Sequence, residues 1–112
     1  MENKADQYYT NKPTSKSEER EIEYYIKDKK IKFLVDNGVF SKEHVDIATN
    51  FMLNVLIDNE KIEGELLDLG CGYGVVGIVL SKFFKDLKIT MLDINERALG
   101  LAKKNCKINR IR

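Results

Sequence analysis

The strongest chemical signal in the sequence is the segment Leu-Asp-Leu-Gly-Cys-Gly-Tyr-Gly at residues 67–74. Its glycines alternate at Gly70, Gly72 and Gly74, between two apolar runs. Glycine permits a sharp turn from a strand into a helix, and it lets a ligand approach the main chain. The following helix start offers unpaired N–H groups and the positive end of the helix dipole. The pattern predicts that the turn, with Cys71 and Tyr73 in it, binds the anionic end of a ligand.

Two acidic residues flank this turn. Asp93 follows it by about 20 residues, where an acid can accept hydrogen bonds from a ribose diol. Asp68 precedes the first glycine, and its charge would repel a pyrophosphate but could pair with an ammonium group. These residues indicate an adenosine-like ligand and favour S-adenosylmethionine. A dinucleotide such as NAD stays open as an alternative, because Gly72-x-Gly74-x-x-Gly77 also satisfies the nucleotide-binding fingerprint.

The other reactive side chains do not form a recognisable centre. The sequence has one histidine, His44, and two cysteines, Cys71 and Cys106. Their number and spacing fit neither a metal site nor a disulfide framework. Cys71 would need a neighbouring base to act as a nucleophile, and His44 falls in a different predicted element. We therefore interpret Cys71 as a small side chain packed in the turn, and the thiols as those of a reduced, cytoplasmic protein.

A strand–helix–strand–helix pattern positions these residues. The apolar runs at residues 65–69 and 87–92 predict strands, and the intervening run at 75–84 predicts a buried helix. Asn95 is predicted to cap a last helix over residues 96–107. Strands joined by one helix are expected to pair in parallel through a right-handed crossover. The sequence thus predicts an α/β fold of the Rossmann-like kind, with the turn and Asp93 at the carboxyl ends of adjacent strands.

Residues 19–58 predict a β-hairpin and a helix in front of this unit, and the polar residues 1–18 predict an N-terminal arm. Alternating apolar residues flank a turn at residues 27–30. Pairing across that turn would place Ile26 opposite Ile31, Tyr24 opposite Phe33, and Ile22 opposite Val35. Ser41 is predicted to cap a helix that runs to about residue 57. The packed stripe of that helix would consist of Val45, Ala48, Met52 and Leu56.

The composition is that of a small globular protein. The chain has 112 residues, of which 43% are hydrophobic and 33% charged. It has no apolar run near the ~20 residues of a membrane span, and no signal-peptide core at its start. The net charge is +1, with lysines gathered near the C-terminus. Because cations there complement the dipole of the last helix, we interpret them as a solvated helix end rather than a nucleic-acid face.

Two sets of motifs resemble a known family. The glycine-rich turn and the segment Met-Leu-Asp-Ile-Asn-Glu-Arg-Ala at residues 91–98 resemble the first two motifs of class I S-adenosylmethionine-dependent methyltransferases. Tyr-Tyr-Thr at 8–10, Asn-Gly-Val-Phe-Ser-Lys at 37–42 and Val-Asp at 45–46 resemble the methyltransferase small domain family. Its best-known members methylate the exocyclic N2 amine of guanine in small-subunit ribosomal RNA. The resemblance therefore implies S-adenosylmethionine as cofactor and RNA as partner.

The resemblance also implies roles for individual residues. The methionine end of the cofactor would lie against Asp68, Gly70, Gly72 and Gly74. Asp93 would hold the ribose hydroxyls and Ile94 would flank the adenine. Phe40, Asp46 and Thr49 would close the cofactor pocket from the preceding loop and helix.

The catalytic motif of the family is an Asn-Pro-Pro-aromatic turn that this sequence does not contain, because its one proline is Pro13. We therefore expect a partial methyltransferase domain over residues 19–112, with a hairpin and helix at 19–58 and a cofactor-binding part at 64–112. The catalytic residues stay unassigned. A strand left with an open edge would be a template for self-association. The alternatives are the nucleotide-binding half of an oxidoreductase and a nucleoside-binding module without catalysis.

Overall fold

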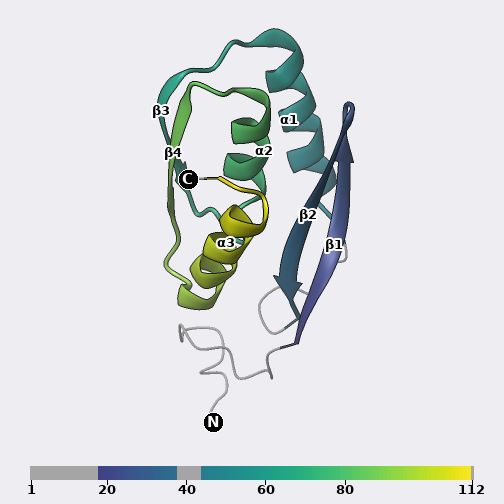
Figure 1. Ribbon diagram of the computed structural model, residues 1–112, viewed down its shortest axis with the longest axis vertical. Helices are drawn as coiled ribbons and strands as arrows, with labels where there is room; N and C mark the ends of the chain where they lie inside the picture. Colours follow the sequence, from purple (N-terminus) through teal and green to yellow (C-terminus); the bar gives the residue numbers. More distant parts are fainter. Residues whose placement is uncertain (1–17, 38–43, 112) are drawn as a thin grey trace.

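The computed structural model describes residues 18–37 and 44–111, which form two small sheets with helices between them (Figure 1). An antiparallel hairpin comes first, and a parallel pair of strands lies in the second half of the chain. The elements in chain order are β1 (Glu19–Ile26), β2 (Lys29–Asp36), α1 (Ile47–Asn59), β3 (Gly64–Leu69), α2 (Val75–Phe83), β4 (Leu87–Leu92) and α3 (Glu96–Ile108).

The second half has the predicted β–α–β–α arrangement. β3 and β4 pair in parallel, with Leu66 opposite Ile89, and α2 connects them. Five of the nine residues of α2 are buried and the other four are half-buried, as its apolar sequence predicts. Asn95 caps α3, since its Oδ1 accepts a hydrogen bond from the Ala98 N–H at 3.0 Å. The elements that position the candidate site therefore lie where the sequence predicts them.

The hairpin forms as predicted, but its predicted register was wrong by two residues. Tyr24 lies opposite Ile31 rather than opposite Phe33. The connection consists of Lys27 and Asp28 alone, and Lys27 takes a left-handed φ of 54°. A two-residue turn with positive φ matches the right-handed twist of the strands, whereas an ordinary type I or II turn would splay them. A shift of two residues leaves every side chain on its predicted face, so the apolar face is still buried.

The predicted start of α1 was wrong. Residues 44–46 are not helical, and the helix begins at Ile47. Its cap is Asp46, whose carboxylate accepts hydrogen bonds from the Ala48 and Thr49 N–H groups at 3.1 and 3.3 Å. Ser41, the predicted cap, lies outside the described residues. The aspartate satisfies two N–H groups of the first turn, which is why the helix begins directly after it.

The predicted packing face of α1 was right only in part. Val45 and Leu56 of the predicted stripe pack in the core. Ala48 and Met52, by contrast, are exposed, and the fully buried residue of the helix is Leu53. On the side toward the hairpin, Asn50 accepts a hydrogen bond from the Tyr24 hydroxyl. Apolar residues occur around the whole helix, so their spacing alone does not select one face. The face of α1 that is buried therefore depends on its packing against α2 and on the contact with Tyr24 of the hairpin.

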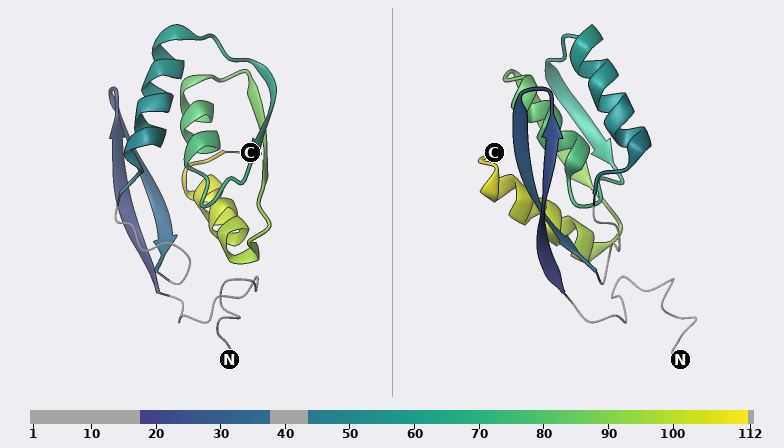
Figure 2. Two further views of the ribbon diagram at one scale, coloured as in Figure 1. Left: turned by 180° about the vertical axis from the view of Figure 1, so that it is seen from behind. Right: turned by 90° about the vertical axis from the view of Figure 1, so that its right-hand side faces the viewer.

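Helices α2 and α3 lie between the hairpin and the β3–β4 sheet (Figures 1 and 2). One core joins both halves of the chain, and its fully buried side chains include Ile31, Phe33, Leu53, Ile78 and Leu80. The other face of the β3–β4 sheet is open, with Leu67 and Leu69 exposed by 56% and 75%. None of the described helices is long and apolar enough to cross a bilayer.

Candidate functional site

The glycine-rich turn connects the end of β3 to the start of α2. Gly70, Gly72 and Gly74 have φ angles of 71°, 57° and 104°, all in the left-handed region. A side chain would be strained in this conformation, so the structure explains why three glycines alternate here. Gly74 is also the residue before the first turn of α2. The predicted strand-to-helix turn is therefore confirmed.

Most backbone N–H groups of the turn donate hydrogen bonds within the protein. Those of Gly70 and Cys71 donate to the Leu92 carbonyl at 2.7 and 2.9 Å. The Gly72 N–H donates to Asp93 Oδ2 at 2.8 Å, and the Gly74 N–H to the Cys71 carbonyl at 3.0 Å. These N–H groups of the turn are therefore not free to hold an anion; the sequence prediction of unpaired N–H groups concerned the helix start that follows. Three of these four hydrogen bonds go to Leu92 and Asp93 at the end of β4, which the local sequence of the turn does not show.

Asp93 lies against the turn, at the predicted place. Its Oδ2 accepts from Gly72, and its Oδ1 accepts from the Asn95 N–H at 2.8 Å. A carboxylate has about four lone-pair positions, so these two bonds leave room for further donors. Asp93 can therefore hold the turn and accept hydrogen bonds from a ligand at the same time.

Asp68 lies beneath the start of α2, where its Oδ2 accepts a hydrogen bond from the Gly77 N–H at 3.2 Å. Burial raises the pKa of Asp68, the bond from Gly77 lowers it, and the charge of Asp93 raises it further. Asp68 therefore feels the negative charge of Asp93. Two acids beside one turn favour a cationic ligand group and oppose a phosphate.

Gly77 completes the nucleotide-binding fingerprint for a packing reason. A Cβ at this position would overlap the side chains of Met91 and Ile89 on β4. The glycine thus lets α2 lie directly on the sheet. Any helix that packs this closely on a strand would require a glycine at the contact, whatever ligand the protein binds. The fingerprint therefore does not by itself indicate a dinucleotide.

Cys71 is buried in the turn. Burial and the charges of Asp68 and Asp93 raise the pKa of the Cys71 thiol to about 11. The thiolate is the nucleophilic form of cysteine, and it is scarce at neutral pH when the pKa is this high. The geometry supports the interpretation of Cys71 as a packed side chain.

A cleft of about 430 Å³ opens where β3 and β4 end. Its lining residues are Leu69, Gly70, Leu92, Asp93 and Ile94. Ile94 and Leu69 are 89% and 75% exposed, so the cleft offers apolar surface beside the Asp93 carboxylate. Open α/β sheets bind ligands at the carboxyl ends of their strands, and this cleft has that position.

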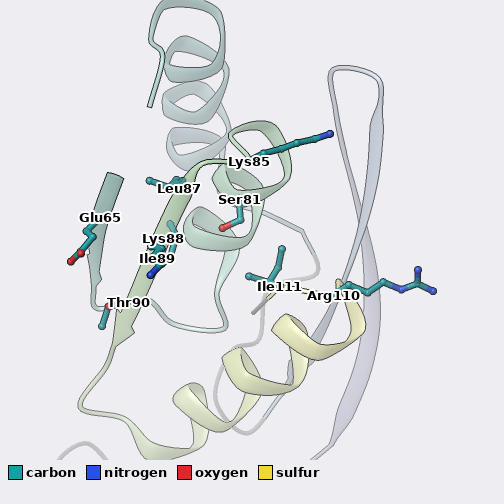
Figure 3. A pocket seen from close by; sticks show the side chains of 9 residues that line it. All are labelled: Glu65, Ser81, Lys85, Leu87, Lys88, Ile89, Thr90, Arg110 and Ile111. Atoms are coloured by element: carbon teal, nitrogen blue, oxygen red, sulfur yellow. The ribbon is translucent and has the colours of Figure 1, made fainter. Parts of the chain in front are cut away.

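A larger cavity of about 770 Å³ is not the better candidate. It lies along β4 and includes Glu65, Lys88 and Arg110. Figure 3 shows that Lys85 and Arg110 point away from Glu65 and Lys88. The charged groups therefore do not converge on a position where a ligand could bind, and neither Asp93 nor the glycine-rich turn lines this cavity.

The three residues predicted to close the pocket are not placed there by the structure. Phe40 lies outside the described residues. Asp46 and Thr49 belong to the start of α1, and neither is among the described residues that line the cleft beside Gly70. Figure 1 shows that α1 runs antiparallel to β3, so it begins toward the end where β3 meets the glycine-rich turn.

The family model of the methyltransferase small domain matches residues 30–112. The chain belongs to the methyltransferase small domain family. The matched segment begins within β2 and includes the glycine-rich turn, Asp68 and Asp93. The resemblance of the sequence motifs to this family is therefore confirmed.

Curated relatives agree with this family. The chain is 39% identical to the protein YbxB of Bacillus subtilis, described as uncharacterized, over 96% of this chain and 53% of that protein. It is 45% identical to ribosomal RNA small subunit methyltransferase C of Haemophilus influenzae strain PittEE, over 66% of this chain and 22% of the relative. The chain thus spans about half of the first relative and about a fifth of the second.

A solved structure has the same fold. It is the 16S rRNA N2 G1207 methyltransferase RsmC of T. thermophilus, in complex with AdoMet and guanosine. The TM-score is 0.75 and the identity 24%, over 89% of this chain and 27% of that one. The predicted α/β architecture, a part of a Rossmann-like methyltransferase fold behind a hairpin and a helix, is confirmed.

In this methyltransferase small domain, the turn has two supports that the sequence interpretation missed. The Tyr73 ring contacts Phe33 of the hairpin edge-on, with centroids 5.6 Å apart. The Tyr73 carbonyl accepts a hydrogen bond from Asn105 Nδ2 at 2.8 Å. Asn105 continues the buried stripe of Ala98, Leu101 and Ala102. A polar residue in an apolar stripe was the signal that could have identified it.

Proposed function

We propose that this chain binds S-adenosylmethionine in the cleft where β3 and β4 end. The observation that carries the proposal is the pair of carboxylates, Asp68 and Asp93, beside the glycine-rich turn. S-adenosylmethionine carries a cationic sulfonium and an α-ammonium group, which two acids would attract. A dinucleotide carries a pyrophosphate, and Asp68 already occupies the helix start that would have to receive it.

Within this proposal, residues of the chain bind and orient the cofactor. Asp93 accepts hydrogen bonds from the ribose hydroxyls with its remaining lone pairs, and Ile94 covers the adenine. Asp68 and the glycine-rich turn, with Cys71 and Tyr73 in its backbone, lie along the methionine end. From the family resemblance, we propose in addition that Phe40, Asp46 and Thr49 contact the bound cofactor from the side where α1 begins, beyond the residues that line the cleft itself. The cofactor supplies an activated methyl group.

We propose further that the complete enzyme methylates a guanine amine of small-subunit ribosomal RNA in the cytoplasm. The support is the name of the relatives, ribosomal RNA small subunit methyltransferase C, and the guanosine in the T. thermophilus complex. Methyl transfer depends mainly on holding the amine in line with the methyl carbon. No residue that could hold an amine is assigned in this chain, so we expect the chain alone to bind cofactor without transferring the methyl group.

Calorimetric titration of the chain with S-adenosylhomocysteine and with NAD tests the cofactor proposal. We expect saturable binding of S-adenosylhomocysteine and much weaker or no binding of NAD, because Asp68 would attract the α-ammonium group of the first ligand and repel the pyrophosphate of the second. The variant Lys107→Ala should bind like the wild type, since its side chain is exposed on the last turn of α3. Tighter binding of NAD would instead favour the oxidoreductase alternative.

We propose that the isolated chain associates with a second copy of itself through the β3–β4 sheet. The open face of this sheet exposes Leu67, Leu69 and Leu92, and the two strands pair with each other alone among the described strands. An exposed apolar face beside unpaired strand edges favours association. We expect sedimentation coefficients that rise with concentration, and a smaller rise for Leu67→Lys than for Glu21→Lys on the hairpin. A concentration-independent monomer would contradict this.

A further inference from the structure

Asn105 is a fully buried polar residue that joins three parts of the fold. Its Oδ1 accepts a hydrogen bond from the Leu34 N–H at 2.6 Å. Its Nδ2 donates to the Leu34 carbonyl at 3.0 Å and to the Tyr73 carbonyl at 2.8 Å. One side chain on α3 thus binds both the outer edge of β2 and the glycine-rich turn.

Burying an amide is costly unless its donors and acceptor are satisfied. The amide of Asn105 meets this condition, because it pairs with the N–H and the C=O of Leu34 much as a neighbouring strand would. The remaining N–H reaches Tyr73. An apolar residue would continue the buried stripe of α3, but it would leave these backbone groups without their partner.

The position of Tyr73 makes this contact important for the candidate site. Tyr73 stands between Gly72 and Gly74, which both have left-handed φ angles. Glycine restrains the backbone weakly, so contacts from outside the turn must set the orientation of the peptide groups. Two contacts do so at Tyr73: the Asn105 amide on its carbonyl and Phe33 on its ring. Two peptide groups earlier in the turn, the Gly72 N–H donates to Asp93 Oδ2.

We propose that Asn105 is a positioning residue for the cofactor. It holds the glycine-rich turn against the hairpin, so that Asp93 and the turn keep the geometry that the ligand requires. Asn105 itself does not line the cleft. The hairpin, which lies outside the strand–helix–strand unit, thereby becomes part of the support of the site. This inference rests on the proposed binding of S-adenosylmethionine at that cleft.

The chain offers a matched control one helical turn away. Asn109 is also buried, and its Nδ2 donates to the Lys32 carbonyl of β2 at 2.9 Å. Its second bond goes to the Asn105 carbonyl, within α3. Asn109 therefore attaches α3 to the same hairpin edge without a hydrogen bond to the turn in the described structure. A comparison of the two residues separates attachment of the hairpin from positioning of the turn.

The test compares Asn105→Asp, Asn105→Ala and Asn109→Ala in the full chain. Aspartate keeps the acceptor for the Leu34 N–H and removes the donors to the Leu34 and Tyr73 carbonyls. We expect both Asn105 variants to bind S-adenosylhomocysteine about tenfold more weakly, as for one lost buried hydrogen bond. Asn109→Ala should lower the melting temperature while its affinity stays within about twofold of the wild type. Equal affinities for the folded Asn105 variants and the wild type would overturn the proposal.

A measurement on the wild type keeps the test decisive if the Asn105 variants do not fold. In ¹⁵N spectra, adding S-adenosylhomocysteine should shift the Asn105 side-chain signals and slow their hydrogen exchange, and leave those of Asn109 unchanged. An unresponsive Asn105 amide in a chain that binds the ligand would overturn the inference. If the wild type binds no S-adenosylhomocysteine, the proposed function fails. Faster exchange of the Gly72 N–H in Asn105→Asp than in Asn109→Ala would then still support the positioning of the turn, and equal rates would refute it.

Discussion

Replacing Asp93 with alanine is expected to weaken S-adenosylhomocysteine binding by about 100-fold. Two effects add. The ligand loses the carboxylate that accepts hydrogen bonds from its ribose. The Gly72 and Asn95 N–H groups lose the same carboxylate as their hydrogen-bond acceptor, so the turn is held less firmly. Hydrogen bonds to a charged group contribute about 1.5–3 kcal/mol each, and the expected loss corresponds to about one to two of them. Calorimetric titration of the variant measures the change.

Glu96→Gln is the control for Asp93→Ala. Like Asp93→Ala, it removes one negative charge shortly after β4. Glu96, however, is exposed on the first turn of α3 and does not line the cleft. Its affinity should stay within about twofold of the wild type, because an exposed charge at this separation is screened by solvent. If Asp93→Ala bound as tightly as Glu96→Gln, Asp93 would not contact the ligand.

The β–α–β–α unit was predictable because its signals are local. Apolar runs of strand and helix length, the glycines and the Asn95 cap each fix a boundary through neighbouring residues. The hairpin register was less predictable. The Lys27–Asp28 turn has no glycine to mark it, and only its left-handed Lys27 shows that two residues suffice.

The details of the site depend on contacts between distant residues. Asp68 and Asp93 were predictable from their spacing to the turn, and the structure places both beside it. The hydrogen-bond partners of the N–H groups in the turn were not predictable, because the carbonyl that accepts from Gly70 and Cys71 belongs to Leu92 of β4. Asn105 was missed because its partners Leu34 and Tyr73 lie 71 and 32 residues away in the sequence. No periodicity in a helix reports a partner at such a distance.

The largest expected loss of stability comes from Phe33→Ala. Phe33 is fully buried, and its ring lies between Tyr24, at 6.5 Å between centroids, and Tyr73, at 5.6 Å. Removing a buried phenylalanine side chain typically costs about 3–5 kcal/mol. Small domains have a free energy of unfolding of about 5–15 kcal/mol, so this loss is a large part of the total. We expect the melting temperature, followed by circular dichroism, to fall by more than about 10 °C.

The control Leu53→Ala separates the loss of stability caused by Phe33→Ala from its effect on ligand binding. Leu53 is equally buried but lies on α1, and truncating a buried leucine also costs about 2–5 kcal/mol. Both variants should therefore melt early. At a temperature where both are folded, only Phe33→Ala should also bind S-adenosylhomocysteine more weakly, because only Phe33 supports the Tyr73 ring in the glycine-rich turn. Equal affinities in the two variants would mean that the hairpin stabilises the fold without shaping the site.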